Sequence, residues 1–205
     1  LPAVLILILQ QTLLLGIGLS AGTARENNRY KDLVPISKHY NGIFRIVLGK
    51  SLCYFMIYMV MGAYLALVIP HLYHFTSLVS AQAIIGLMVP YILACTFFGM
   101  MLSCLVRYRE NVMLLVVFSS VPFLFMTGLS WPQSNIPGFW QGVATIIHST
   151  FGVRGFMRIS SMGATLQDIQ TEYIDIWIQS QGYFFSLYVI YRFQIISTSV
   201  TYTHI

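Results

Sequence analysis

The sequence predicts an all-α membrane protein whose helices cross the bilayer several times. Of the 205 residues, 57% are hydrophobic and only 8% are charged, whereas soluble domains carry about 25% charged residues. Long apolar stretches alternate with short polar loops, and each spanning helix needs about 20 residues. We therefore predict five transmembrane helices in one membrane domain, with a hairpin of short re-entrant helices before the last of them.

The five predicted spans are apolar stretches bounded by loops, prolines or charges. They cover residues 2–22, 47–69, 81–106, 112–129 and 173–191. The first ends in a run of small residues, which let helices pack closely. We expect the second to stop at Pro70 and the third to kink at Pro90. The last is the most polar span, because Asp175 and several uncharged polar residues interrupt it, and the tail at 195–205 has no assigned role.

The basic residues set the predicted orientation. They cluster in the loop at 23–46 and in the turn after the third span, so both are cytoplasmic by the positive-inside rule. Within that loop, Ser37 is expected to cap a short amphipathic helix over residues 38–46. Nine of the eleven basic residues lie on the inner side, and the exceptions are Arg154 and Arg158. The net charge of +5 thus reflects topology and does not indicate a nucleic-acid partner.

The segment at 130–158 is apolar but cannot form one straight span. Pro132 and Pro137 each remove a backbone donor and clash with the preceding turn. Trp131 and Trp140 flank them, and tryptophan prefers the headgroup level. Irregular backbone at membrane depth is tolerated only where protein or a water-filled cavity covers it. We therefore predict that this segment dips into the outer side of the membrane and caps a pathway across it.

Two basic residues in this segment are candidates for binding. Arg154 and Arg158 lie four residues apart on one helical face. They are expected either to contact an anionic substrate or lipid headgroup, or to reach the outer interface and pair with an acidic side chain. The available acids are Asp168, Glu172 and Asp175. Asp175 is itself a candidate, because ionisable groups within a span often serve function.

Enzymatic and metal-binding alternatives have weaker support. His148 and Ser149 suggest an intramembrane hydrolase, but adjacent side chains on a helix point about 100° apart, so they cannot act as base and nucleophile for each other. His71 and His74 have no Cys, Asp or Glu nearby to complete a metal shell. No P-loop motif occurs in the sequence, so energy from ATP would have to come from a partner.

Three short motifs resemble the permease subunits of type-2 ABC exporters, the ABC-2 membrane family. The first is TARENNR at 23–29, which follows the first span, and the second is LVPIS at 33–37. The third is GLSWP at 128–132, followed by Ile136-Pro137 and Arg154-Gly155-Phe156. The third motif, with Met162-Gly163-Ala164 after it, is most similar to bacterial drug-export members. One departure is that Asn27-Asn28-Arg29 replaces the family's Glu-x-Gly-Thr run.

The resemblance implies a fold, a function and a set of site residues. The five spans would be the second to sixth of a six-span domain, with the first span and an external domain preceding Leu1. The region at 23–46 would couple to cytoplasmic ATPase subunits through Arg25, Glu26, Asn27, Arg29 and Tyr30. The re-entrant gate would contain Trp131, Pro132, Pro137, Trp140 and His148.

The resemblance also implies partners and a location. The permease would bind no cofactor or metal itself, and ATP with Mg²⁺ would bind the partner subunit. Further partners would be a second permease copy, membrane lipids and a periplasmic adaptor, in the bacterial inner membrane. The alternatives that stay open are an intramembrane lipid-modifying enzyme and a passive channel or scaffold.

Overall fold

The computed structural model describes residues 2–27, 42–73, 81–106, 108–128 and 137–203, and every regular element in these ranges is a helix. Their order is α1 (Pro2–Glu26), α3 (Gly42–Ala63), η2 (Tyr64–Val68), α4 (Ile69–Leu72), α5 (Ala81–Ser103), α6 (Arg109–Met126), α7 (Gly138–Ile146), α8 (His148–Met162) and α9 (Gln170–Thr203). The part of the predicted amphipathic helix at 38–41 lies outside the described residues, and residues 42–46 begin α3.

Four stretches of helix are long and apolar enough to cross a membrane. They are Ala3–Glu26, Gly42–Leu72, Ala81–Ser103 and Arg109–Met126. The predicted class, an all-helical protein with several spans, is therefore confirmed. Helix α9 has 34 residues but a more polar sequence, and it is not among these four.

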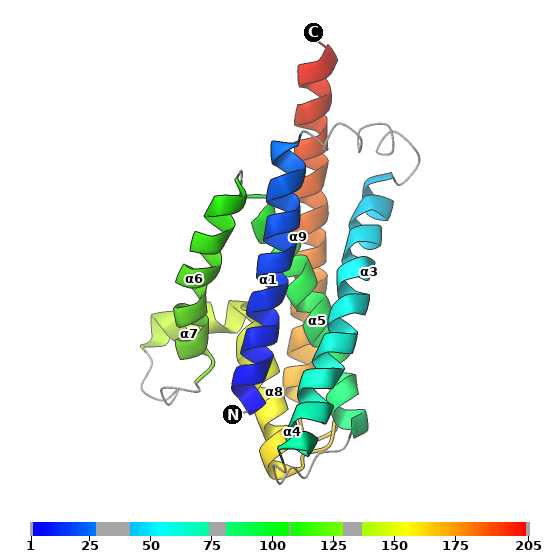
Figure 1. The fold of residues 1–205 in the computed structure, drawn as a ribbon. Coiled ribbons are helices and arrows are strands. Elements are labelled where there is room, and N and C mark those ends of the chain that lie inside the picture. Colours follow the sequence, from blue (N-terminus) through cyan, green and yellow to red (C-terminus); the bar gives the residue numbers. More distant parts are fainter. Residues whose placement is uncertain (1, 28–41, 74–80, 107, 129–136, 204–205) are drawn as a thin grey trace.

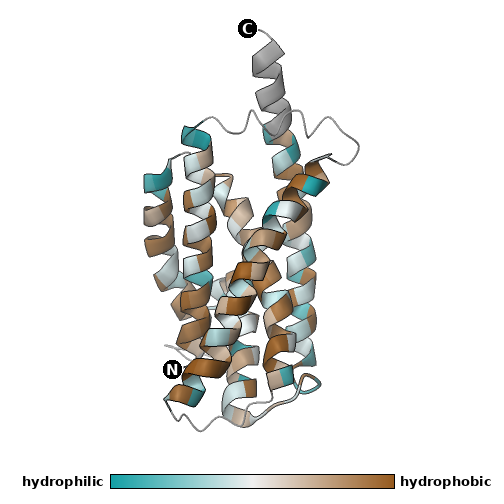
Figure 2. Ribbon diagram, turned by 45° about the vertical axis from the view of Figure 1, so that its right-hand side comes forward, coloured by the Kyte–Doolittle hydropathy of each residue, from teal (hydrophilic) through white to brown (hydrophobic). Residues whose placement is uncertain are grey.

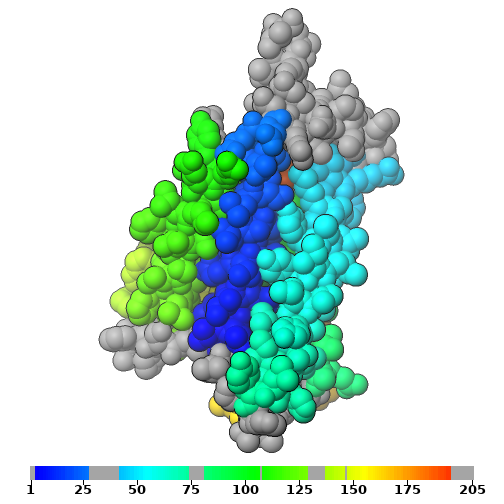
Figure 3. All heavy atoms as spheres, in the orientation of Figure 1, coloured from blue at the N-terminus to red at the C-terminus, as the bar shows by residue number. Residues whose placement is uncertain are grey.

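The helices form a bundle with α5 at its centre (Figure 1). Helix α5 packs against α9, α1, α3 and α8, while α1 also contacts α6. On the face drawn in Figure 3, α1 lies between α6 and α3. Helix α5 contributes the largest share of the core, which includes Leu87, Met88, Tyr91 and Ile92. The site residues described below are therefore held by the best-packed part of the molecule.

The outer helices present apolar surfaces to their surroundings. Only 11% of the most apolar part of Gly42–Leu72 is buried, against 67% for α5. Exposed side chains there include Leu52 and Val60 on α3, and Phe118 on α6 has a relative exposure of 74%. Figure 2 shows the apolar residues running along the helices. A contiguous apolar surface of this kind fits contact with lipid.

The second and the last predicted spans differ most from the helices in the structure. The second predicted span does not stop at Pro70, because the chain continues as helix through η2 and α4 to Leu72. Pro70 stands in the first turn of α4, directly after the wider turns of η2, and a proline is tolerated at that position. Helix α9 continues without a break past Arg192 to Thr203, so most of the tail at 195–205 is helical.

Candidate functional site

The broken segment forms two short helices. Helix α7 has 9 residues and starts directly after Pro137, and α8 has 15 residues. Ile147, with φ −94° and ψ 117°, separates them. Gly163, at φ 65°, ends α8 in the left-handed conformation, where its N–H and that of Ala164 bond to the last carbonyls of the helix. Neither helix is long enough to cross a bilayer, which takes about 20 residues.

The two short helices differ in burial. Helix α8 packs against α1, α5 and α9, and Val153, Phe156 and Ile159 are almost completely buried. Helix α7 instead exposes Phe139 and Trp140, whose rings meet edge to face with centroids 5.6 Å apart. One short helix is thus part of the core, and the other lies at its border. Trp131 and Pro132, predicted gate residues, lie outside the described residues.

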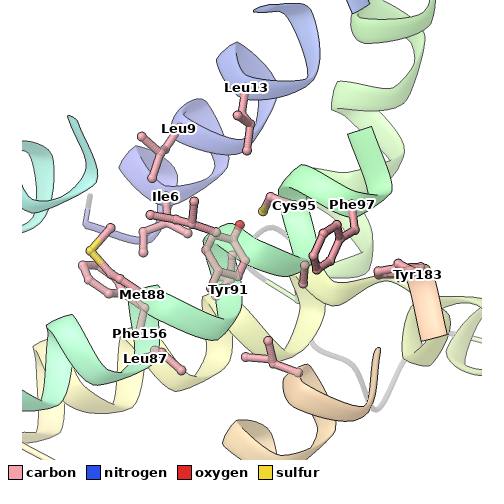
Figure 4. Close-up of a cluster of buried hydrophobic side chains, with 14 of the residues drawn as sticks. Ile6, Leu9, Leu13, Leu87, Met88, Tyr91, Cys95, Phe97, Phe156 and Tyr183 are labelled. Carbon is pink, nitrogen blue, oxygen red and sulfur yellow. The ribbon is translucent and has the colours of Figure 1, made fainter. Parts of the chain in front are cut away.

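A hydrogen-bonded polar group joins α8 to α1 and α5 inside the bundle. Ser149 at the start of α8 donates its hydroxyl proton to Oε1 of Gln10, at 2.6 Å. The Tyr91 hydroxyl of α5 donates to the same oxygen at 2.9 Å. Each of the three residues is at most 1% exposed. Figure 4 shows Tyr91 among apolar side chains, with its hydroxyl oxygen pointing towards α1. We call Gln10, Tyr91 and Ser149 the outer triad.

His148 lies beside the outer triad and is held by aromatic rings. Its ring centroid is 5.1 Å from that of Phe98 and 5.8 Å from those of Tyr91 and Tyr183. The side chain is fully buried, and its two ring nitrogens have no hydrogen-bond partner among the described residues. Because the Ser149 hydroxyl is bonded to Gln10, no nucleophile–base pair exists between these neighbours. This geometry disfavours the hydrolase alternative.

The other predicted binding residues lie near the junction of α8 and α9. Arg158 forms an ion pair with Glu172, with Nη1 and Oε1 2.8 Å apart. This is the pairing that the sequence raised as the alternative to ligand contact. The half-buried Arg154 stacks its guanidinium over Phe151, 5.9 Å from the ring centroid. Asp175 is half-buried on α9.

At the opposite end of α1, Arg25 and Glu26 contact the connection between α5 and α6. Arg25 donates from Nη1 to the Val106 carbonyl at 2.5 Å and from Nη2 to the Cys104 carbonyl at 2.6 Å. Glu26 accepts the backbone N–H of Arg109 at 3.1 Å, and its Oε2 is 3.5 Å from Arg109 Nε. The structure thus brings together two of the five predicted coupling residues.

The remaining predicted coupling residues lie beyond α1. Asn27 is exposed in the turn after the helix, and its N–H bonds to the Thr23 carbonyl at 3.1 Å. Arg29 and Tyr30 lie outside the described residues.

Sequence reasoning missed Gln10, the acceptor at the centre of the outer triad. The sequence does place this amide within an apolar span, and an amide there must find a hydrogen-bond partner or face a polar path. Its partners were beyond reach of local patterns, because they lie 81 and 139 residues away along the chain. Among the described residues, no group of three or more His, Cys, Asp or Glu side chains is placed to hold a metal ion.

The family model described as "ABC-2 family transporter protein" matches residues 1–197, which is nearly the whole chain. No curated protein and no solved structure matches the chain.

Proposed function

The chain belongs to the ABC-2 family of transporter proteins, and from this premise we propose that it is the permease of an ATP-driven exporter. Membership makes it the integral membrane part of an ABC transporter, a transport permease that is not itself catalytic. Permeases of this family generally pair with ATPase subunits. The direction of transport, the gate and the route of coupling are the parts that we propose.

The observation that carries the proposal is the position of α7 and α8. They lie near the end of the bundle where α1 begins, whereas Arg25 and Glu26 lie at the end where α1 stops (Figure 1). We assign the first end to the outside and the second to the cytoplasm, following the distribution of basic residues. The short helices then form a re-entrant hairpin that closes the outer end of the pathway. Its gate residues are Trp131, Pro132, Pro137, Trp140 and His148.

We assign α9 as the fifth span of this chain and the sixth of the complete domain. Polar side chains lower the hydropathy of α9, and some of them contact other helices instead of facing the surroundings. Gln179 donates to the Thr145 carbonyl of α7 at 2.5 Å, and Ser180 is 1% exposed. Polar groups that contact other helices cost less in a membrane than polar groups that face lipid.

The inner end provides the route of coupling. ATPase subunits would act on the region at 23–46, with Asn27, Arg29 and Tyr30 as contact residues and ATP with Mg²⁺ bound in the ATPase. A second permease copy would complete the pathway in the bacterial inner membrane, with lipids around it and a periplasmic adaptor outside. Arg154, Arg158 and Asp175 would meet the substrate or a headgroup at the outer exit, and drug-like molecules are the proposed substrate class.

The direct test is reconstitution of the full-length protein. It should be co-expressed with its candidate ATPase, purified as a complex and placed in proteoliposomes with ethidium as the transport probe. We expect co-purification and ethidium transport that requires ATP and stops when the P-loop lysine of the ATPase is replaced. Transport that ignores ATP would favour a passive channel. Absence of both association and ATP-dependent transport would overturn the proposal.

A further inference from the structure

Two helices, α1 and α9, bring side chains to the connection between α5 and α6. Beyond the two bonds from Arg25, Gln194 of α9 donates from Nε2 to the Cys104 carbonyl at 3.0 Å. That carbonyl therefore accepts from both α1 and α9. We call Arg25 and Glu26, with their partners Cys104, Val106 and Arg109, the inner clamp. It links the inner ends of α1, α5 and α6 to one another, and Gln194 adds α9.

The chemistry of helix ends explains why these two residues suit the connection. The last carbonyls of a helix and the first N–H groups of the next have no partner within their own helices. The planar fork of Arg25 supplies two donors to carbonyls that follow α5. The carboxylate of Glu26 accepts the first N–H of α6, where a negative charge also complements the helix dipole. Arg25 thus binds the turn that follows α5, and the adjacent Glu26 caps the start of α6.

Two glycines of α1 allow this close approach. A Cβ on Gly22 would lie 2.8 Å from Cα and 2.9 Å from N of Arg109. A Cβ on Gly18 would clash with Val112 of α6. Since the obstacle at Gly22 is backbone, no rotamer change could relieve it. The inner end of α1 is therefore in backbone contact with the start of α6.

We propose that Arg25 and Glu26 are positioning residues that transmit movement of the coupling region into α5, α6 and α9, and that they do not contact the ATPase. Their polar atoms bond within the chain, and α1 leads directly into Asn27, where the proposed ATPase-binding region begins. A push on that region would displace the end of α1, and the inner clamp would carry the connection with it. This inference rests on the proposed function.

The test uses Arg25→Lys in the full-length protein complexed with its ATPase in membranes. Lysine keeps the charge but cannot hold two carbonyls with a rigid fork. Cys104 is 5% exposed, so its rate of reaction with a maleimide reports whether the connection between α5 and α6 opens. Cys95 in α5 is 1% exposed, and its lack of reaction reports that the bundle stays folded. Arg192→Lys is the matched control, because Arg192 is an exposed basic residue in α9 that lies outside the region at 23–46 and outside the inner clamp.

We expect Arg25→Lys to raise the rate of Cys104 labelling about tenfold, which corresponds to one charged hydrogen bond of about 1.4 kcal/mol. Cys95 labelling, ATPase co-purification and ATP hydrolysis should stay at wild-type levels while ethidium transport per ATP falls. Arg192→Lys should change none of these quantities.

Two results would overturn this inference without affecting the proposed function. In the first, Arg25→Lys leaves both Cys104 labelling and transport per ATP unchanged. In the second, Arg25→Lys loses ATPase co-purification while Cys104 stays protected. The second would make Arg25 a docking contact. If the wild-type protein itself failed to bind an ATPase or to transport, the proposed function would be wrong and the inference would fail with it.

Discussion

Helix α1 takes part in two polar contact regions that differ in charge, in exposure and in the kind of hydrogen bond. The outer triad around Gln10 is neutral, at most 1% exposed and made of bonds between side chains. The inner clamp around Arg25 is charged, partly exposed and made largely of bonds from side chains to backbone. The two regions are fifteen positions apart on one helix, or about 22 Å at 1.5 Å per residue.

This difference in burial and charge indicates which end of α1 is the less mobile. Breaking the outer triad leaves polar atoms buried in the core without a partner, which costs more than it would at the surface. At the inner clamp, water can take over part of the bonding as the groups separate, so exchange costs less. We infer that the outer triad anchors α8 to α1 and α5, whereas the inner clamp moves together with the end of α1 during a transport cycle. Three predictions test this contrast, and a fourth concerns the turn between α8 and α9.

The largest effect is expected from Gly152→Ala in α8. A Cβ at this position would lie 2.2 Å from Cδ2 and Cε2 of the Tyr91 ring, which is fixed in the core. The ring must move and its bond to Gln10 must weaken, so we expect a loss of about 1–3 kcal/mol in the free energy of unfolding. Thermal unfolding of the purified protein in detergent measures it. Gly142→Ala in α7 is the matched control, because no atom of the described residues beyond its own stretch of helix lies within 4 Å of the added Cβ. Equal stability of the two variants would contradict the prediction.

The second effect is expected from Gln10→Leu. This change leaves the hydroxyls of Tyr91 and Ser149 without their acceptor, at a cost of about 1–2 kcal/mol. Unfolding in detergent again measures it. The triple variant with Tyr91→Phe and Ser149→Ala removes the stranded hydroxyls and should recover most of the loss. A triple variant less stable than Gln10→Leu would show that the hydroxyls have other partners.

A smaller effect is expected at the inner clamp from Glu26→Gln. The amide oxygen still accepts the Arg109 N–H, and only the ion pair is lost. The side chains of that pair are 62% exposed for Arg109 and 30% for Glu26, so we expect less than about 1 kcal/mol. The stabilities of wild type and variant should differ at low salt and become equal at high salt, because salt screens the ion pair. A loss as large as that of Gln10→Leu would remove the contrast between the two regions.

The smallest effect is expected at Asp168, in the turn between α8 and α9. Bonds from the Thr165 N–H and hydroxyl, each 2.8 Å, lower the pKa of the Asp168 carboxyl. A carboxylate with a depressed pKa stabilises the folded state above its unfolded pKa of about 4, and this contribution is lost as the pH falls through the folded pKa. Stability of wild type should therefore decline slightly more than that of Asp168→Asn on acidification. Parallel curves for the two proteins would contradict this.

The sequence predicted the helices well but could not predict their side-chain partners. Hydropathy located four spans, and the prolines and glycines after α6 indicated short helices, because these signals act over a few residues. Arg25 was identified from its motif, but its contact with Val106 lies 81 residues away and depends on how α1 and α6 pack. The polar sequence of α9 likewise made its length hard to predict, since Gln179 and Gln194 find acceptors in parts of the chain that are distant in sequence.

The length of α9 has a mechanical consequence. A helix of 34 residues is about 51 Å long, whereas the hydrocarbon core is about 30 Å thick, so roughly 20 Å of α9 would stand outside the lipid if it spans the membrane as proposed. In Figure 1 its carboxyl end reaches beyond every other helix, on the side of the inner clamp. Gln194 lies between the membrane part and this overhang. A tilt of α9 about the contact between Gln194 and Cys104 would therefore move its carboxyl end further than the contact itself.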